Sequence, residues 1–279
     1  MKRKLLCCTF AVVFLGASIA AAQEARLDKI TVTLSDPSRP ASVRAHVLSG
    51  GITVRGYDGK DVIVQSVYRG ARSSGHRSAP GTEGMKRIDN PNTGLEITEE
   101  NNVVNIETGA FNRPVDLEIQ VPRRTSLNLK SVNDGDIQVE NVQGEIEVQD
   151  LNGRVKLLGI SGSAVVHALN GEVTAVLTDI SPGKPMSFSS MNGTIDVTFP
   201  PTLKANVVMQ SQNGDIYTDF DVKMDARASD PVIEDARGKG GKYKVRIDKA
   251  VRGTINGGGP EIMFKTFNGD IFIRKASAK

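Results

Sequence analysis

The stretch that decides the fold is Asn133–Ala175, NDGDIQVENVQGEIEVQDLNGRVKLLGISGSAVVHALNGEVTA. Within it a glycine recurs every nine residues, and the residues two and four positions after each glycine are apolar, as Ile137 and Val139 are after Gly135. That alternation places the apolar side chains on one face of a strand. A nine-residue unit is too small to bury such a face alone, so the units must stack. The stretch therefore predicts an all-β solenoid, or β-helix.

Alternate units differ, which predicts a coil of 18 residues made from two nine-residue units. Asp134, Asn152 and Asn170 precede glycine at one corner, whereas Gln143 and Ser161 precede it at the other. We expect the first three to stack on one another. The residues after the glycines of that corner alternate in sign and predict an exposed charge ladder: Asp136, Arg154 and Glu172.

The same turn continues at longer spacing, where an Asn-Gly pair is followed by Thr or Asp and then Ile. We expect the glycines of the array to be structural turns that supply a positive φ. They are Gly135, Gly144, Gly153, Gly162, Gly171, Gly193, Gly214 and Gly269.

The flanking sequence predicts further β-structure within a single domain over 23–279. Alternating apolar and polar residues predict four N-terminal strands: Ile30–Leu34, Val43–Leu48, Ile52–Arg55 and Val62–Tyr68. Residues 70–94 are rich in Gly, Ser, Pro and charge, which predicts a long polar loop. Residues 225–242 predict a polar insertion.

The N-terminal segment 1–22 has the pattern of a cleavable signal peptide. Lys2, Arg3 and Lys4 precede an apolar stretch, and Ala20–Ala22 places small residues before a predicted cleavage at Gln23. Cys7 and Cys8 follow the charged residues too closely to mark a lipid anchor. We expect an exported protein of the periplasm, cell surface or medium, with no transmembrane segment in the mature chain.

The net charge does not favour a nucleic-acid partner. The chain has 35 Lys and Arg against 32 Asp and Glu, and three of the basic residues lie in the predicted signal peptide. The mature chain would then have equal numbers of acidic and basic residues, whereas a polyanion-binding domain needs a basic excess.

No pattern predicts a metal, another cofactor or a catalytic group. His46, His76 and His167 are far apart in the sequence and lack zinc-ligand spacing. A calcium β-roll also repeats every nine residues, but it needs a recurrent Asp. Here Arg154 occupies that column.

Two kinds of residue cluster remain as site candidates. Arg69, Arg72, His76 and Arg77 form a small cationic cluster in the predicted loop, where a ligand could make contact. The acidic stretch could in principle supply the paired carboxylates of a glycan-cleaving enzyme, although alternating strand residues usually face solvent. Its members are Asp134, Asp136, Glu145 and Glu147.

The sequence resembles the DUF4097 family, whose members are described as candidate bacterial adhesins. The resemblance covers roughly Leu27–Lys275. It lies in the nine-residue glycine repeat, the Asn-Gly-Asp-Ile turns at Asn213–Ile216 and Asn268–Ile271, and the strands ending at Pro122 and Pro200. It departs from the family at 70–94 and 227–242. The resemblance implies a β-solenoid, exported in many members, and no functional residues can be transferred from it.

We therefore expect an adhesin-like binding or structural module of the cell envelope, without catalysis, whose partner is an envelope polymer or protein. Two alternatives remain open. One is a carbohydrate-active β-helix enzyme, either a polysaccharide lyase or a hydrolase. The other is a protein-binding partner in envelope-stress regulation.

Overall fold

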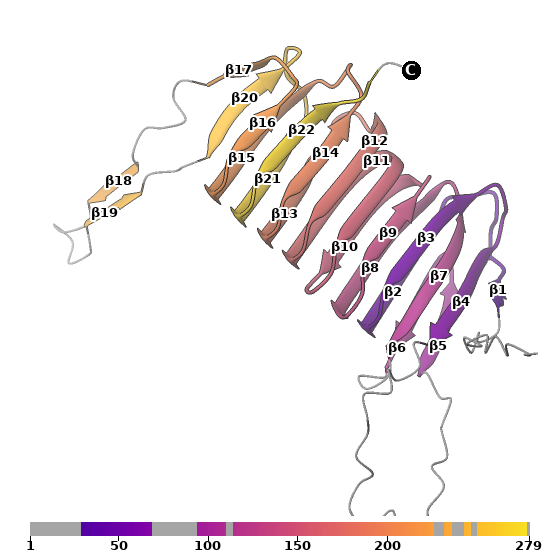
Figure 1. Cartoon of the computed structure of the whole chain (residues 1–279). Helices are drawn as coiled ribbons and strands as arrows, with labels where there is room; N and C mark the ends of the chain where they lie inside the picture. The colour runs from indigo at the N-terminus through magenta and orange to yellow at the C-terminus, as the bar shows by residue number, and fades with distance from the viewer. Residues whose placement is uncertain are drawn as a thin grey trace, which may run out of the picture.

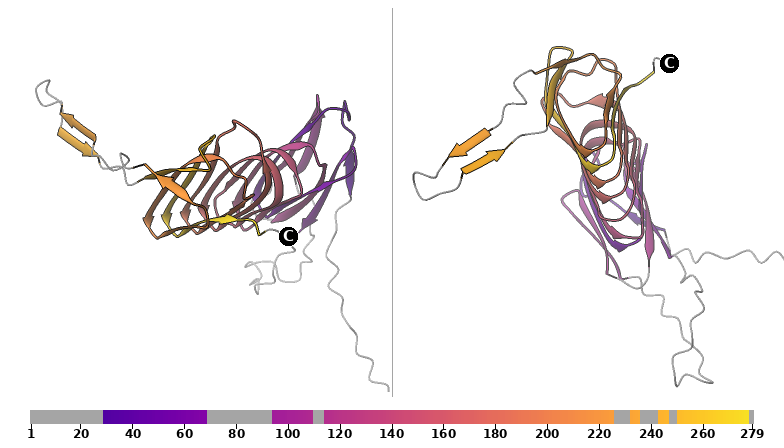
Figure 2. Two further views of the ribbon diagram at one scale, coloured as in Figure 1. Left: turned by 90° about the horizontal axis from the view of Figure 1, so that it is seen from above. Right: turned by 60° about the vertical axis from the view of Figure 1, so that its left-hand side comes forward.

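The computed structural model describes residues 29–68, 94–109, 114–225, 232–235, 243–246 and 250–277, and these contain strands but no helix. Most strands stack into a flattened solenoid with two walls, as the view near its axis shows (Figure 2, right). The predicted all-β solenoid is confirmed. The described part of the chain likewise offers no helix with the length and apolarity needed to cross a membrane.

The first wall takes its strands from widely separated parts of the chain (Figure 1). In spatial order it consists of β1 (Ile30–Val32), β4 (Val62–Tyr68), β7 (Val115–Pro122), β3 (Ile52–Tyr57), β9 (Ile137–Glu140), the beginning of β11 (Val155–Asn170), β12 (Val173–Ile180), β14 (Ile195–Phe199), β22 (Ile271–Lys275) and β16 (Ile216–Thr218).

The second wall lies opposite the first, and the long strand β11 turns the corner to join both. In spatial order it consists of β5 (Leu95–Glu100), β6 (Val103–Thr108), β2 (Ala41–Ser49), β8 (Thr125–Asn133), β10 (Gln143–Asp150), the end of β11, β13 (Met186–Asn192), β21 (Glu261–Asn268), β15 (Ala205–Asn213), β20 (Val251–Ile255) and β17 (Val222–Met224).

The core is the narrow space between the walls, where alternate residues of each strand are buried. Phe188 and Phe264 of the second wall stack with ring centroids 5.6 Å apart. Phe199 of the first wall meets both rings edge-on, at 6.3 and 6.2 Å. The alternation read from the sequence thus defines the buried face, as expected.

The predicted 18-residue coil is confirmed in the central part. Val155 pairs with both Ile137 and Val173, and Gly144 pairs with Gly162. The coil before it is one residue longer on the second wall, because Ile146 pairs with Leu127. The additional residue is Asp134, which has a φ of 58°.

That additional residue corrects the predicted column of Asp134, Asn152 and Asn170. Asn133, rather than Asp134, occupies the stacked position, since Asn152 Nδ2 donates to Asn133 Oδ1 at 3.3 Å. Asn170 donates to Asn152 at 3.0 Å. The same side-chain hydrogen bond joins the next coils, at 2.8, 2.7 and 2.9 Å, through Asn192, Asn268 and Asn213. We call these six residues the asparagine ladder.

The glycines lie at the corners as predicted, but the expected reason is wrong for most of them. Of the eight predicted turn glycines, only Gly162 and Gly269 have a positive φ. The corner instead requires close contact between coils. A Cβ on Gly171 would lie 1.8 Å from the carbonyl oxygen of Gly153, and one on Gly153 would lie 2.1 Å from that of Gly135. A side chain has no room there.

The order of the coils in space differs from their order in the sequence. β2 and β3 lie between the coil of β6 and β7 and the coil of β8 and β9. Near the other end, β21 and β22 lie between β13 and β14 on one side and β15 and β16 on the other (Figure 1). The sequence repeat did not indicate either insertion.

The four N-terminal strands are confirmed as β1, β2, β3 and β4. The predicted loop 70–94 lies outside the described residues except for Gly94. The predicted insertion 225–242 is described only in part. There, β18 (Val232–Asp235) pairs with β19 (Tyr243–Arg246) as a separate antiparallel sheet.

Candidate functional site

The predicted cationic ligand contacts cannot be placed. Arg69, Arg72, His76 and Arg77 all lie outside the described residues, as does the predicted signal peptide. The structure therefore directs attention to the two walls.

The structure does not gather the four acidic residues that could have formed a catalytic pair. Asp134 and Asp136 flank Gly135 at one corner, whereas Glu145 follows Gly144 at the other and forms an ion pair with Lys184. Glu147 accepts a hydrogen bond of 2.7 Å from Asn128 on the second wall.

Half of the expected charge ladder is present. Arg154 reaches Asp136 with an ion pair of 3.1 Å. Glu172, which lies just before β12, instead accepts a hydrogen bond of 3.4 Å from Thr174 of that strand. Asp134 and Asp136 also line a shallow acidic groove of about 390 Å³ with Asp116 and Glu118. Asp116 there accepts a hydrogen bond of 2.6 Å from the backbone N–H of Gly51.

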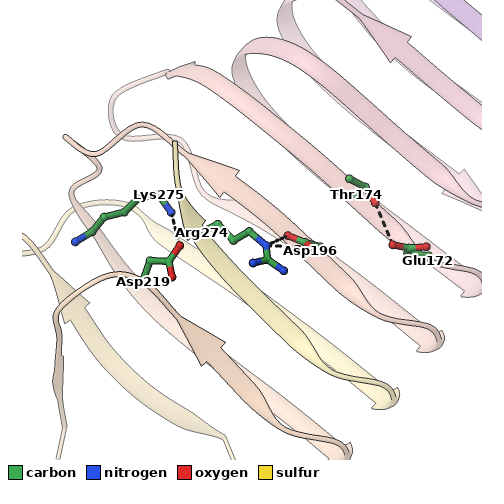
Figure 3. Close-up of polar contacts among 6 residues, drawn as sticks. All are labelled: Glu172, Thr174, Asp196, Asp219, Arg274 and Lys275. Atoms are coloured by element: carbon green, nitrogen blue, oxygen red, sulfur yellow. Dashed lines mark hydrogen bonds and ion pairs between the residues drawn. The ribbon is translucent and has the colours of Figure 1, made fainter. Parts of the chain in front are cut away.

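The outer surface of the first wall carries many carboxylates, and several are held by neighbours (Figure 3). Arg274 Nε donates to both oxygens of Asp196, at 2.8 and 3.0 Å. This hydrogen bond raises the pKa of Arg274. The backbone N–H of Lys275 donates to Asp219 at 3.3 Å. The first of these contacts is a surface ion pair between the adjacent strands β22 and β14, and such a pair contributes about 0–1 kcal/mol.

The second wall presents a different outer surface, with a row of polar and basic side chains parallel to the solenoid axis. Each member pairs with the next across neighbouring strands of the sheet, and each is at least partly exposed. This polar row consists of His46, Lys130, Gln149, His167, Ser189, Lys265 and Gln210. No carboxylate interrupts it.

An exposed apolar row runs alongside, two residues further along each strand. It consists of Leu48, Val132, Leu151, Leu169, Met191 and Phe267, of which the first two are half-buried and the last five directly precede residues of the asparagine ladder. The last four are 42, 41, 48 and 47% exposed. Large apolar side chains that line up on a surface mark an interaction site more often than single ones do.

The two rows meet in an open groove of about 580 Å³ over β11, β13, β21 and β15. Met191, Met263 and Phe267 supply its apolar surface. Its polar lining comes from hydroxyl, amide and basic groups: His167, Ser187, Ser189, Ser190, Gln210, Gln212, Lys265 and Thr266. No Asp or Glu lines it.

Two histidines for which the sequence indicated no site, His46 and His167, belong to this surface. His46 lies at one end of the polar row, and His167 lies in the groove with Nδ1 2.6 Å from Ser189 Oγ. Ser189 in turn donates to the carbonyl of Val166 at 3.1 Å. Because the serine hydroxyl has only one proton, which it donates to Val166, His167 Nδ1 must donate to Ser189, and this leaves Nε2 available to a ligand.

Sequence reasoning did not find this surface. Val142, Leu151, Ile160 and Leu169 all stand two residues before a glycine, yet Val142 and Ile160 are buried whereas Leu151 and Leu169 are exposed. The available signal was the Asn-Gly pair, since an apolar residue directly before it faces outward. Among the described residues, no three His, Cys, Asp or Glu side chains gather as a metal site would require.

Comparison with solved structures gives two similar chains. A candidate cell adhesion protein from Clostridium sporogenes is 9% identical, with a TM-score of 0.40, over 89% of this chain and 99% of that one. A candidate adhesin from Bacteroides fragilis is 11% identical, with a TM-score of 0.38, over 90% of this chain and 97% of that one. No curated protein matches the chain.

The family comparison covers most of the chain. The model of the family described as Toastrack DUF4097 matches residues 24–256, and so ends just before β21. The match agrees with the glycine repeat and with the two-walled solenoid. This chain therefore belongs to the Toastrack DUF4097 family.

Proposed function

We propose that this protein is an exported, adhesin-like binding module of the cell envelope, which holds an extended polymer against the outer surface of its second wall. The observation that carries the proposal is the pairing of the polar row with the apolar row along successive coils. Binding sites generally combine apolar surface with a few well-placed polar groups.

The wall suits a partner that is long and repetitive. Successive coils are about 4.8 Å apart, so the seven strands of the polar row present a strip about 30 Å long with one polar or basic side chain at each step. The backbone of a continuous sheet is also ordered without a ligand, which lowers the entropic cost of binding.

The alternative of a glycan-cleaving enzyme has less support. A glycosidase places two carboxyl groups about 5–10 Å apart across the scissile bond. The groove of the second wall has no carboxylate in its lining. Asp134 and Asp136 are at a different corner from Glu145, and both Asp136 and Glu145 have a cationic partner.

The test is co-sedimentation of the purified protein with whole sacculi and with fractionated envelope glycans, followed by an assay for released sugar. We expect binding without release. The variant Met191→Ser/Phe267→Ser should lose binding, whereas Tyr217→Ser, an exposed aromatic residue on the first wall, should retain it. Released sugar would refute the non-catalytic proposal, and equal loss in both variants would refute the assignment to the second wall.

A further inference from the structure

The first wall carries carboxylates along its outer surface, whereas the polar row of the second wall contains none. Carboxylates recur along the column after the corner glycines of the first wall and on its strands: Asp136, Glu172, Asp196, Asp215 and Asp270. The polar row of the second wall instead contains Lys130 and Lys265 together with two histidines. Among the described residues, no carboxylate forms an ion pair with either lysine.

Carboxylates near the polar row lie at its margins. Glu107 pairs with His46 beyond one end of the row. Glu147 lies two residues from Gln149 and already accepts hydrogen bonds from Gln149 Nε2 at 3.1 Å and from Asn128 at 2.7 Å. The groove itself, from His167 to Gln210, therefore favours an anionic partner over a cationic one.

Three of the four basic groups are also regularly spaced, and the fourth, His46, pairs directly with Lys130. Along the row, Lys130, His167 and Lys265 are separated by one intervening strand each, first the strand of Gln149 and then that of Ser189. Two coil steps correspond to about 9.6 Å. An extended disaccharide unit has about this length, so one negative charge on every second sugar would meet one basic group each time.

We infer that the polymer held by the second wall is a linear glycan that bears carboxylate groups, and this inference rests on the binding function proposed above. The chain of sugars lies parallel to the solenoid axis. Its carboxylates face Lys130, His167 and Lys265, and its apolar ring faces cover the row from Leu151 to Phe267. Gln149, Ser189 and Gln210 lie between or beside the basic groups and can hydrogen-bond sugar hydroxyls.

In this arrangement hydrophobic contact supplies most of the affinity, and charge supplies the selectivity. Met191 and Phe267 are nearly half exposed in the free protein, so a sugar ring that covers them removes apolar surface from water. The lysines are exposed and each interacts weakly, so they select the charged glycan rather than supply most of the affinity.

The test is a binding titration of the full chain, expressed with its own N-terminal segment, against polygalacturonate, polymannuronate and hyaluronan. Each is compared with its carboxyl-reduced form, which keeps the backbone and loses the charge. Sodium polyglutamate and phosphatidylglycerol vesicles test an acidic peptide and a membrane surface. The variants are Lys130→Gln/Lys265→Gln and, as a matched control on the first wall, Lys156→Gln. Far-UV circular dichroism verifies that each variant is folded.

We expect at least one carboxylated glycan to bind and its reduced form to bind more weakly. The double lysine variant should lose about 5- to 30-fold in affinity, since exposed charge pairs contribute about 0.5–1 kcal/mol each. Lys156→Gln should bind as the unmodified protein does.

Other outcomes overturn the inference in distinguishable ways. Equal binding of charged and reduced glycans, or preference for polyglutamate or vesicles, would refute the carboxylated glycan. The proposed function would stand if sacculi still bound through Met191 and Phe267. Failure of every polymer to bind, sacculi included, would refute both the proposed function and this inference.

Discussion

Asp150 offers a quantitative test of how the coils are joined. Its side chain is only 2% exposed, and Oδ2 has no hydrogen-bond partner among the described residues. Oδ1 accepts the backbone N–H of Asn152 at 3.1 Å. Burial, assisted by the charge of Asp136 and opposed by the Asn152 hydrogen bond, raises the pKa of Asp150 from 3.8 to about 7.

The equivalent positions in other coils show what a neutral group does there. Ala168, which pairs with Asp150, has no polar side chain, but four other equivalent residues carry a hydroxyl that donates to the carbonyl oxygen of a corner glycine in the adjacent coil, at 2.9–3.1 Å. They are Ser131, Ser190, Thr266 and Ser211. Protonated Asp150 can donate in the same manner toward Gly135, whereas the ionised carboxylate would remain buried without compensation.

The sign and size of the effect follow from the proton linkage. The folded protein binds this proton more tightly than the unfolded chain does, so the stabilisation is complete below pH 3.8 and is lost as the pH rises to about 7. A difference of roughly 3 pKa units corresponds to about 4 kcal/mol. We predict that Asp150→Ser and Asp150→Asn abolish this loss of stability with rising pH.

The assay is urea denaturation followed by far-UV circular dichroism between pH 4 and pH 9. Between pH 4 and pH 8 the unmodified protein should lose about 4 kcal/mol of unfolding free energy because of Asp150, and neither variant should show this loss. Asp221→Ser, which removes an exposed carboxylate, is the control and should leave the profile unchanged. Parallel profiles for Asp150→Ser and the unmodified protein would refute the reasoning.

Four other predictions address the corners, the core, the surface and the N-terminus. Gly171→Ala should destabilise the protein by several kcal/mol in urea denaturation, because its Cβ would overlap the Gly153 carbonyl, whereas Gly109→Ala, with its nearest neighbour at 4.0 Å, should be neutral. Phe188→Ala should cost about 3–5 kcal/mol by the same measurement, from lost aromatic contacts and an uncollapsed cavity; a change below 1 kcal/mol would contradict the described core. Asn170→Ala removes two exposed side-chain hydrogen bonds of the ladder and should cost about 1–2 kcal/mol in thermal unfolding. Mass spectrometry of protein recovered from the envelope should show a chain beginning at Gln23, and an intact N-terminus there would contradict the predicted cleavage.

The length of the coil could be predicted from the sequence because the corner constraint that sets it is local. Gly153 and Gly171 recur at the coil length, and each must lack a side chain for the next coil to fit. The first member of the asparagine column was predicted to be Asp134 but is Asn133, because both residue types are common before a glycine turn. Only the pairing across strands shows which of them stacks.

The order of coils and the binding surface could not be predicted from one sequence. Asn213–Ile216 and Asn268–Ile271 have the same sequence, Asn-Gly-Asp-Ile. The repeat pattern therefore does not indicate which of the two segments lies next to the coil of β13 and β14. Lys265 and Ser189 are adjacent only because β21 lies beside β13. A row built from distant segments has no signature along the chain, even though each member is an ordinary outward residue of its strand.

The insertion of β21 and β22 into the array has a consequence for the time course of folding. β21 lies between β13 and β15 and pairs in parallel with both, whereas β13 and β15 do not pair with each other. Until residues 261–275 have been synthesised and docked, two open strand edges remain available to any other extended chain. Contacts of this sequence separation also form slowly, because a long loop must close first. We therefore expect the chain to be prone to aggregate before β21 has docked, and a chaperone that covers these edges should improve its yield.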